Sequence, residues 1–245
     1  MTTPSAETPA PVSFWRRMGG LFSRKLTWRQ SLTTLFVLAT SLYLWMRFEA
    51  TWLRVREEAV AIPAWNGQRP LKIVLMSDFH LDYFDYGYLE RTVNLVLAQK
   101  PDLVLLGGDF GTPNVPEPEI EFLLHLGNLA HAVPTYACLG NHDHGLSFSP
   151  DTTIRNPPVA SLLEEAGVKV LRNARVDLEV AGGRLVLASV GEIWANDMDP
   201  ERCLEREAAF AAAPLTLLLA HNPDCKEAVA AFHWDLLCSG HTHAG

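Results

Sequence analysis

Short apolar runs and helical stretches alternate along most of the chain after Pro70. The run LKIVLMSDFH begins with aliphatic and β-branched residues and ends in polar ones, which predicts a short buried strand. Residues 89–99 follow with apolar side chains at helical spacing, which predicts an amphipathic helix. The same succession of strand and helix then continues to the last motif of the chain.

The later elements follow from the same pattern. Further strands are predicted in DLVLLGGDF, PTYACLGNHD, VKVLRN, GRLVLASVGE, PLTLLLAHNPD and WDLLCSGHTH. Further helices are predicted over residues 120–130, 160–166, 202–213 and 227–231. Because strands alternate with helices, we predict an α/β fold whose sheet is at least partly parallel and is covered on both faces.

The N-terminal part of the chain has a different pattern. Residues 31–46, SLTTLFVLATSLYLWM, form an apolar stretch of 16 residues without a charge, which is short for a membrane span of about 20 residues. Arginines and tryptophans flank the stretch, and such side chains can reach the membrane interface from a short span. We therefore predict that this stretch forms an N-terminal membrane-anchor helix, which either crosses the membrane or lies in its interface.

Two other interpretations of this segment are less favoured. A cleaved signal peptide requires a small-x-small site after the apolar stretch, and MRFEATW does not provide one. A buried core helix does not explain the basic and aromatic flanks. Five Lys or Arg residues precede the stretch and three follow it, which favours the following domain outside the membrane. The difference is small, and an interfacial helix would be compatible with the cytoplasmic side, so the side of the membrane stays open.

The segments divide the chain into four predicted regions. These are a disordered, basic and aromatic tail (1–30), the anchor (31–48), a charged linker that contains a helix (49–69) and an α/β domain (70–245).

Net charge is distributed unevenly between these regions. The chain carries a net charge of −8, but residues 1–60 hold eight Lys or Arg against four acidic residues, which leaves −12 for residues 61–245. A domain this acidic is unsuited to tracking a nucleic-acid backbone, so no nucleic-acid partner is expected. It suits a site that binds cations first and an anionic substrate through them. The sequence indicates no protein partner.

Polar clusters follow five of the predicted strands directly. In an open α/β sheet the carboxyl ends of strands converge on the ligand crevice, so five strands aim Asp, His and Asn side chains at one place. The clusters are SDFH with Asp78 and His80, GGD with Asp109, GNHD with Asn141, HNPD with His221, and GHTH with His241 and His243.

These residue types suit a pair of metal ions. In D-x-H and H-x-H the two side chains leave the same side of an extended segment, so Asp78 and His80 can share one ion, and His241 and His243 can each take a neighbouring ion. Mixed carboxylate and imidazole ligands suit Mn, Fe, Zn or Co. Seven ligands exceed one tetrahedral site, whereas two ions about 3.5–4 Å apart can clamp the attacking and leaving oxygens of a phosphoryl displacement.

Each cluster taken alone has a structural explanation. A Gly-Asp pair often marks only a turn, and HNPD can be a helix start with Pro223 at the first helical position. All five clusters in this order are improbable as coincidence. His125, His131 and His233 lie away from the strand ends, and we interpret them as ordinary core or surface residues.

The five motifs together resemble the calcineurin-like metallophosphoesterase family over about residues 70–245. The sequence around the motifs is most similar to a membrane-associated bacterial branch of that family, as in SDFHLD, AHNPD and SGHTHAG. This branch includes general phosphodiesterases and UDP-2,3-diacylglucosamine pyrophosphatases. The resemblance implies a metallophosphoesterase sandwich of two mixed β-sheets flanked by helices. Since relatives usually continue beyond the last motif, we expect the domain to be truncated at its C-terminus.

The resemblance also implies a role for each motif residue. The first metal would be held by Asp78, His80, Asp109 and His243. The second metal would be held by Asp109, Asn141, His221 and His241, with Asp109 bridging. Manganese is favoured for both.

Three further residues complete the candidate site. By the same resemblance, His142 would stand beside the phosphate and stabilise or protonate the leaving oxygen, and Asp143 would orient His142. His144 follows these residues and is a weaker candidate for substrate binding. For Trp194, in GEIWAND, lining of the pocket and a structural role are equally open.

The sequence therefore predicts a metal-dependent phosphoesterase at the bacterial cytoplasmic membrane. Its substrate would be a phosphodiester or a pyrophosphate, and a lipid-linked molecule such as UDP-2,3-diacylglucosamine is the first candidate. A general extracytoplasmic phosphodiesterase or phosphomonoesterase is the alternative. A metal-binding scaffold without catalysis is less favoured, because all seven ligands and His142 are present.

Overall fold

The computed structural model describes residues 27–81, 86–111, 119–146, 158–205 and 214–243 of the chain. The chain divides into two compact units, Met1–Val55 and Arg56–Gly245, and each is described by itself. The predicted tail over residues 1–30 lies almost entirely outside the described residues.

The first unit contains one long helix, α2 (Trp28–Ala50). Thr27 begins it with a reciprocal capping box, in which the Thr27 hydroxyl accepts from the Gln30 N–H and the Gln30 side chain accepts from the Thr27 N–H. The helix extends beyond the apolar stretch at both ends, so its 23 residues reach about 34 Å, enough to cross a bilayer core. Its length and composition fit a membrane anchor, and a signal sequence near an N-terminus meets the same criterion.

The helix predicted within the linker is wrong beyond Ala50. Residues 52–62 contain neither helix nor strand. The end of the linker instead belongs to the second unit, because Ile62, Ala64 and Trp65 pack against its core. The Trp65 indole N–H donates to the carbonyl of Arg69 at 3.0 Å, which fixes this entry to the domain.

The first sheet of the second unit is parallel throughout its described strands. It has the order β1 (Ile73–Met76), β2 (Leu103–Leu106), β3 (Thr135–Ala137) and β4 (Lys169–Val170). Neighbouring strands are parallel in each pair. The crossovers contain α3 (Tyr86–Ala98), α4 (Glu119–Ala132) and α5 (Pro158–Glu165), which agrees with the predicted alternation.

The second sheet is mixed. Its order is β5 (Ala174–Val180), β6 (Gly183–Ser189), β7 (Leu215–Leu219) and β8 (Leu236–Cys238). Strand β5 is antiparallel to β6, and the other pairs are parallel. Strand β5 was not predicted, although its partly buried residues alternate with exposed ones along ARVDLEV.

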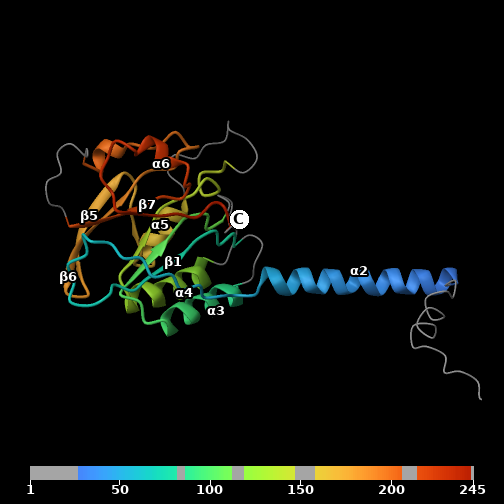
Figure 1. Ribbon diagram of the computed structural model, residues 1–245. Coiled ribbons are helices and arrows are strands. Elements are labelled where there is room, and N and C mark those ends of the chain that lie inside the picture. Colours follow the sequence, from blue (N-terminus) through green and yellow to red (C-terminus); the bar gives the residue numbers. More distant parts are fainter. Residues whose placement is uncertain (1–26, 82–85, 112–118, 147–157, 206–213, 244–245) are drawn as a thin grey trace, which may run out of the picture. The chain divides into compact units, whose positions relative to one another are not determined.

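The two sheets pack face to face, and helices cover their outer faces. In β2, Leu103 and Leu105 point into the core between the sheets, whereas Val104 and Leu106 pack beneath the helices. Continuous burial of all four residues is what a central parallel strand requires. Helices α3 and α4 lie on one side of the sandwich, and α6 (Cys225–Ala228) lies on the other (Figure 1). The predicted α/β fold with two sheets flanked by helices is therefore confirmed.

Two of the predicted helices differ in the structure. The predicted helix over 227–231 lies two to three residues earlier, as α6, directly after Asp224. Most of the predicted helix over 202–213 lies outside the described residues, because residues 206–213 are not among them. At its start the structure has only the end of the short 3-10 helix η2 (Pro200–Arg202), followed by residues 203–205 without helix. The four cysteines are unpaired, and Cys138, Cys203 and Cys225 are buried as small apolar side chains.

Candidate metal centre

The predicted ligands lie at the carboxyl ends of five strands. Asp78 and His80 follow β1, Asp109 follows β2, Asn141 follows β3, His221 follows β7, and His241 and His243 follow β8. Three of these strands belong to the first sheet and two to the second, so the ligands gather across one edge of the sandwich. Side-chain distances show that all seven come together there.

Backbone conformation is unusual at five of these residues. Asp78, His80, Asp109, His241 and His243 have φ between 43° and 70°, and the described residues include only four other non-glycine positions with positive φ. Each such conformation costs about 1–3 kcal/mol and persists only where the surroundings enforce it. Here the β1 and β2 ends are tied together, because the N–H of Asp78 donates to Gly108 O at 2.9 Å and that of His80 to Asp109 O at 3.0 Å.

Two motif glycines permit the close approach of the strand ends. Gly108 has φ of 92°, and a Cβ there would lie 2.6 Å from the backbone nitrogen of Gly140 and 2.9 Å from His221 Nδ1. A Cβ on Gly140 would overlap the Asp109 carboxylate. The glycines of GGD and GNHD are therefore required by space, because any side chain would push the ligand loops apart.

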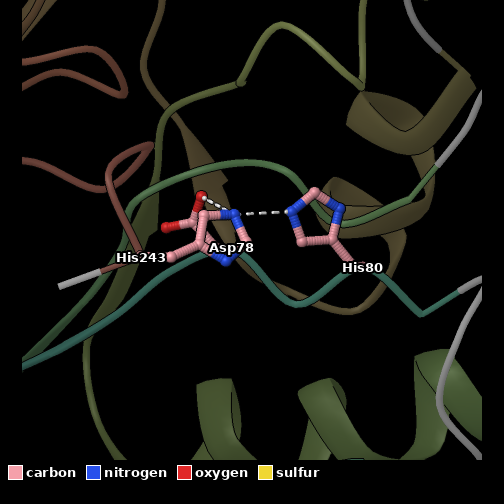
Figure 2. A group of neighbouring side chains, drawn as sticks. All are labelled: Asp78, His80 and His243. Atoms are coloured by element: carbon pink, nitrogen blue, oxygen red, sulfur yellow. Dashed lines mark hydrogen bonds and ion pairs between the residues drawn. The ribbon is translucent and has the colours of Figure 1, made fainter. Parts of the chain in front are cut away.

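The first group of donor atoms comes from the ends of β1 and β8. His80 Nε2 and His243 Nε2 are 3.1 Å apart, and His243 Nε2 is 3.4 Å from Asp78 Oδ1 (Figure 2). Both oxygens of Asp78 also accept from the backbone N–H of His241, each at 3.0 Å, which fixes the carboxylate. One carboxylate oxygen and two imidazole nitrogens thus point at one another.

The second group comes from the ends of β3, β7 and β8. Asn141 Oδ1 is 3.1 Å from both His221 Nε2 and His241 Nδ1, and these two nitrogens are 3.2 Å apart. His221 Nδ1 lies 2.6 Å from the carbonyl of Gly107, so this nitrogen donates and Nε2 faces the group. Such an ordering of the far nitrogen is typical of metal-binding histidines.

Asp109 lies between the two groups. Its Oδ2 is 3.2 Å from His221 Nε2 and 3.8 Å from His80 Nε2. Its Oδ1 accepts from the backbone N–H of His142 at 2.9 Å. The side chain is buried, and the carboxylate is held in a position from which one oxygen faces both groups.

Protonation of His221 reflects this arrangement. Burial acts to lower the pKa of His221, but the hydrogen bond to Asp109 and its charge outweigh burial and raise the pKa to about 9. In the absence of a cation, the imidazolium neutralises the buried carboxylate. The pKa of His241 is lowered by burial and by the positive charge of His221, so His241 favours the neutral imidazole that a metal ion binds.

Metal binding is therefore expected to release a proton from His221. Because the pKa lies near 9, the apparent affinity for a divalent metal should rise with pH up to about 9. Calorimetric titration with Mn²⁺ at pH 8, in two buffers of different ionisation enthalpy, should show release of close to one proton per chain. Identical heats in the two buffers would contradict this protonation state.

Asp143 joins the loops that carry the ligands. Its Oδ2 accepts from the N–H of Asp109 at 3.0 Å and of Gly140 at 2.8 Å, and its Oδ1 accepts from that of Phe110 at 2.9 Å. Burial, with the nearby charge of Asp109, raises its pKa to about 7. This role was not predicted, because the contacts depend on how the β2 and β3 ends meet. The orientation of His142 by Asp143 stays a prediction.

Replacing Asp143 with asparagine is expected to weaken metal binding by about 10- to 100-fold, as for other residues that orient ligands. The amide has one acceptor oxygen and would direct an NH₂ group at backbone N–H donors, so the β2 and β3 ends would separate. Mn²⁺ titration of the variant measures the effect. Asp177→Asn, on the exposed face of β5, is the control, and equal affinity in the two variants would contradict this role.

The two histidines of GNHDH (residues 140–144), His142 and His144, differ in exposure. The His142 ring is half-buried and meets the His80 ring edge to face, with centroids 4.7 Å apart. His142 therefore borders the donor groups, and its role beside the phosphate stays a prediction. His144 is 1% exposed, which is unfavourable for contact with a substrate from solvent. The role of His144 in substrate binding stays a prediction, and its burial does not support that role.

The segment after β6 contributes two further residues near the centre, Glu192 and Trp194. Trp194 is 56% exposed, and its ring centroid is 4.6 Å from that of His241. Glu192 is a buried carboxylate that was not among the predicted site residues. A polar residue soon after a buried strand was the available signal, because β6 ends at Ser189 beside β7 in parallel register.

The donor set fits a pair of divalent transition metals. Three groups of residues place ligand atoms within 4.8 Å of one another, namely Asp78–His80–His243, His80–Asp109–His142 and Asp109–His221–His241. Adjacent groups share His80 or Asp109, as expected for two neighbouring ions. Imidazole and carboxylate donors suit Mn, Fe, Zn or Co.

Comparison with known proteins agrees with this geometry. The family described as calcineurin-like phosphoesterase matches residues 71–245. Phosphodiesterase YaeI of Escherichia coli is 36% identical over 177 residues, which cover 72% of this chain and 62% of that protein. The chain therefore spans less than two thirds of this relative.

A more distant relative and a solved structure extend the comparison. UDP-2,3-diacylglucosamine pyrophosphatase LpxG of Chlamydia trachomatis is 25% identical over 263 residues, covering 87% of this chain and 76% of that protein. A 5′-nucleotidase precursor from Thermus thermophilus has a TM-score of 0.44 and 17% identity over 71% of this chain and 42% of its own. The family match over most of the chain is decisive: this chain belongs to the calcineurin-like phosphoesterase family.

Proposed function

We propose that this protein is a binuclear-metal phosphoesterase that hydrolyses a phosphodiester or pyrophosphate bond. The observation that carries the proposal is the position of Asp109, whose Oδ2 faces a donor nitrogen of each group, at 3.2 Å from His221 and 3.8 Å from His80. A carboxylate shared between two donor groups is the arrangement that two adjacent ions require.

For the division of the ligands between the two ions, we propose the assignment that the family resemblance implies. Asp78, His80, Asp109 and His243 would hold one ion, and Asp109, Asn141, His221 and His241 the other. The metal pair, when bound, would supply charge stabilisation to the phosphoryl group and acidify a water for attack. Manganese is the favoured metal.

The chain's own residues would then position the phosphate and transfer the proton. The His142 ring is partly open to solvent and lies at the border of the donor groups, from which it can donate a proton to the leaving oxygen. The bond from its backbone N–H to Asp109 Oδ1 ties the position of His142 to the shared carboxylate. Asp143 would hold both loops in register through its backbone hydrogen bonds.

A lipid-linked substrate is the first candidate. The support is the apolar helix α2, which has the length and composition of a membrane anchor, and the similarity to LpxG, whose name specifies a diacylated sugar nucleotide. An anchor at the cytoplasmic membrane would hold the site near such a substrate. We propose UDP-2,3-diacylglucosamine as the substrate to test first.

A general phosphodiesterase or phosphomonoesterase outside the cytoplasm is the second candidate. Its support is the higher identity to phosphodiesterase YaeI. Protease accessibility of the domain in spheroplasts separates the candidates, because UDP-linked substrates are cytoplasmic. A scaffold without catalysis is less supported, because the ligands and His142 are all at the centre.

A substrate panel on metal-loaded full-length protein tests the proposal. The panel contains bis(p-nitrophenyl) phosphate, p-nitrophenyl phosphate and UDP-2,3-diacylglucosamine, each with added Mn²⁺ and with chelator. We expect metal-dependent hydrolysis of at least one diester or pyrophosphate. Failure to hydrolyse any phosphoester, in protein that binds metal, would contradict the proposed function.

A further inference from the structure

Trp194 is an exposed aromatic residue directly beside the candidate metal centre. It is 56% exposed although it contacts His241, with the two rings nearly perpendicular at 86° and centroids 4.6 Å apart. One part of the indole is thus fixed against a proposed metal ligand, and the rest faces solvent. Large apolar side chains in such a position commonly contact ligands.

The segment that carries Trp194 is held by several side chains. Asn173 Oδ1 accepts from the N–H of Gly191 and of Asp199, each at 2.8 Å, so one side chain ties both ends of the segment. Asn173 Nδ2 donates to the carbonyl of Asp197 at 2.6 Å, and Arg172 forms a bidentate ion pair with the Asp197 carboxylate. These contacts fix the backbone of the segment on both sides of Trp194.

Glu192 fixes the turn that presents the indole. Its Oε2 accepts from the N–H of Ala195 at 2.7 Å, and its backbone carbonyl accepts from Asp197 at 3.2 Å. The carboxylate is 3% exposed, and its Oε1 has no hydrogen-bond partner among the described residues. Burying a carboxylate with an unpartnered oxygen costs stability, and the bond that this carboxylate does form holds the turn around Trp194.

We propose that Trp194 is a substrate-binding residue that contacts a planar ring carried by the group esterified to the bound phosphate, and that Glu192 is its positioning residue. The inference rests on the proposed function, because the metal centre would place the phosphate. Trp194 lies on the side of His241, so the contacted group would extend from that side of the centre. A planar group suits the indole because offset stacking uses its whole face, whereas a flexible chain gains only part of that area.

Two phosphonates with the same charged group separate this contact from metal binding. Calorimetry on metal-loaded full-length protein would measure the dissociation constants of phenylphosphonate and methylphosphonate. We expect Trp194→Ala to weaken phenylphosphonate binding by about 3- to 10-fold. Methylphosphonate binding should change by less than about 2-fold, because it lacks a ring to stack. Trp194→Phe should restore most of the preference.

Matched variants test the positioning role and the specificity of the effect. Glu192→Ala should reduce the preference for phenylphosphonate as Trp194→Ala does, whereas Glu192→Gln retains an acceptor for Ala195 and should keep it. Trp65→Phe is the control, because Trp65 packs at Gly183, the opposite end of β6.

Equal losses for both phosphonates, or no loss in Trp194→Ala, would overturn the inference. The binding assay does not depend on turnover. An inactive protein that still prefers phenylphosphonate through Trp194 would therefore contradict the proposed function and not this contact.

Discussion

Asp109→Asn is expected to reduce phosphoesterase activity by about 10³-fold or more and to leave at most one tightly bound metal per chain. The shared carboxylate would contribute to both ions, and stabilisation by a metal pair amounts to several kcal/mol, of which about 4 kcal/mol corresponds to 10³-fold. Asparagine keeps the shape of the side chain and an oxygen that can accept from the His142 N–H. The variant therefore removes the charge with little change in packing.

Activity and metal content should be measured together on this variant. Asp177→Asn makes the same chemical change on the exposed face of β5 and should have wild-type activity. Circular dichroism would establish that both variants fold. A variant at Asp109 that retains two ions and full activity would show that the carboxylate is not shared between them.

His142→Ala is expected to lower turnover by about 10²- to 10⁴-fold while metal content is unchanged. The contact between His142 and Asp109 uses the backbone N–H, which alanine retains, so the loop should keep its position. The loss should depend on the leaving group. An alkyl phosphodiester needs protonation of the departing oxygen more than a p-nitrophenyl ester does, so the alkyl ester should lose more activity.

The dependence on leaving group distinguishes a proton donor from a structural residue. His131→Ala is the control, because His131 is exposed in the last turn of α4. Equal losses for the alkyl and the p-nitrophenyl ester would show that His142 does not protonate the leaving group. Loss of bound metal in His142→Ala would instead show that His142 contributes to metal binding.

Local pattern was sufficient to predict the strands that carry the ligands. The runs before Asp78, Asp109 and His221 are continuous, aliphatic and bounded by glycine or polar residues, as buried parallel strands require. Because such strands end at the same edge of a sheet, convergence of their polar ends was also predictable. The helix proposed after Ala50 was wrong because charged residues there do not form a buried face, and chain entry through Trp65 depends on packing against a core built by distant residues.

Contacts between distant loops were not predictable from the sequence. Asp143 binds backbone groups 32–34 residues away, and no periodicity encodes that contact. Strand β5 did have a signal in its alternation, but three of its seven residues are charged and exposed, so it lacks the continuous apolar run that marks the other strands. Positive φ at Asp78 and His241 likewise follows from the closed arrangement of the strand ends, because Asp and His enter that region more readily than most residues but do not adopt it by default.

Electron paramagnetic resonance during Mn²⁺ titration tests the central claim most directly. If Asp109 is shared between two ions, the full-length protein should bind two Mn²⁺ per chain and give a spin-coupled spectrum at saturation. That coupling should disappear in Asp109→Asn and persist in Asp177→Asn. Saturation at one Mn²⁺ per chain, or two ions without coupling, would contradict a two-metal centre built around Asp109.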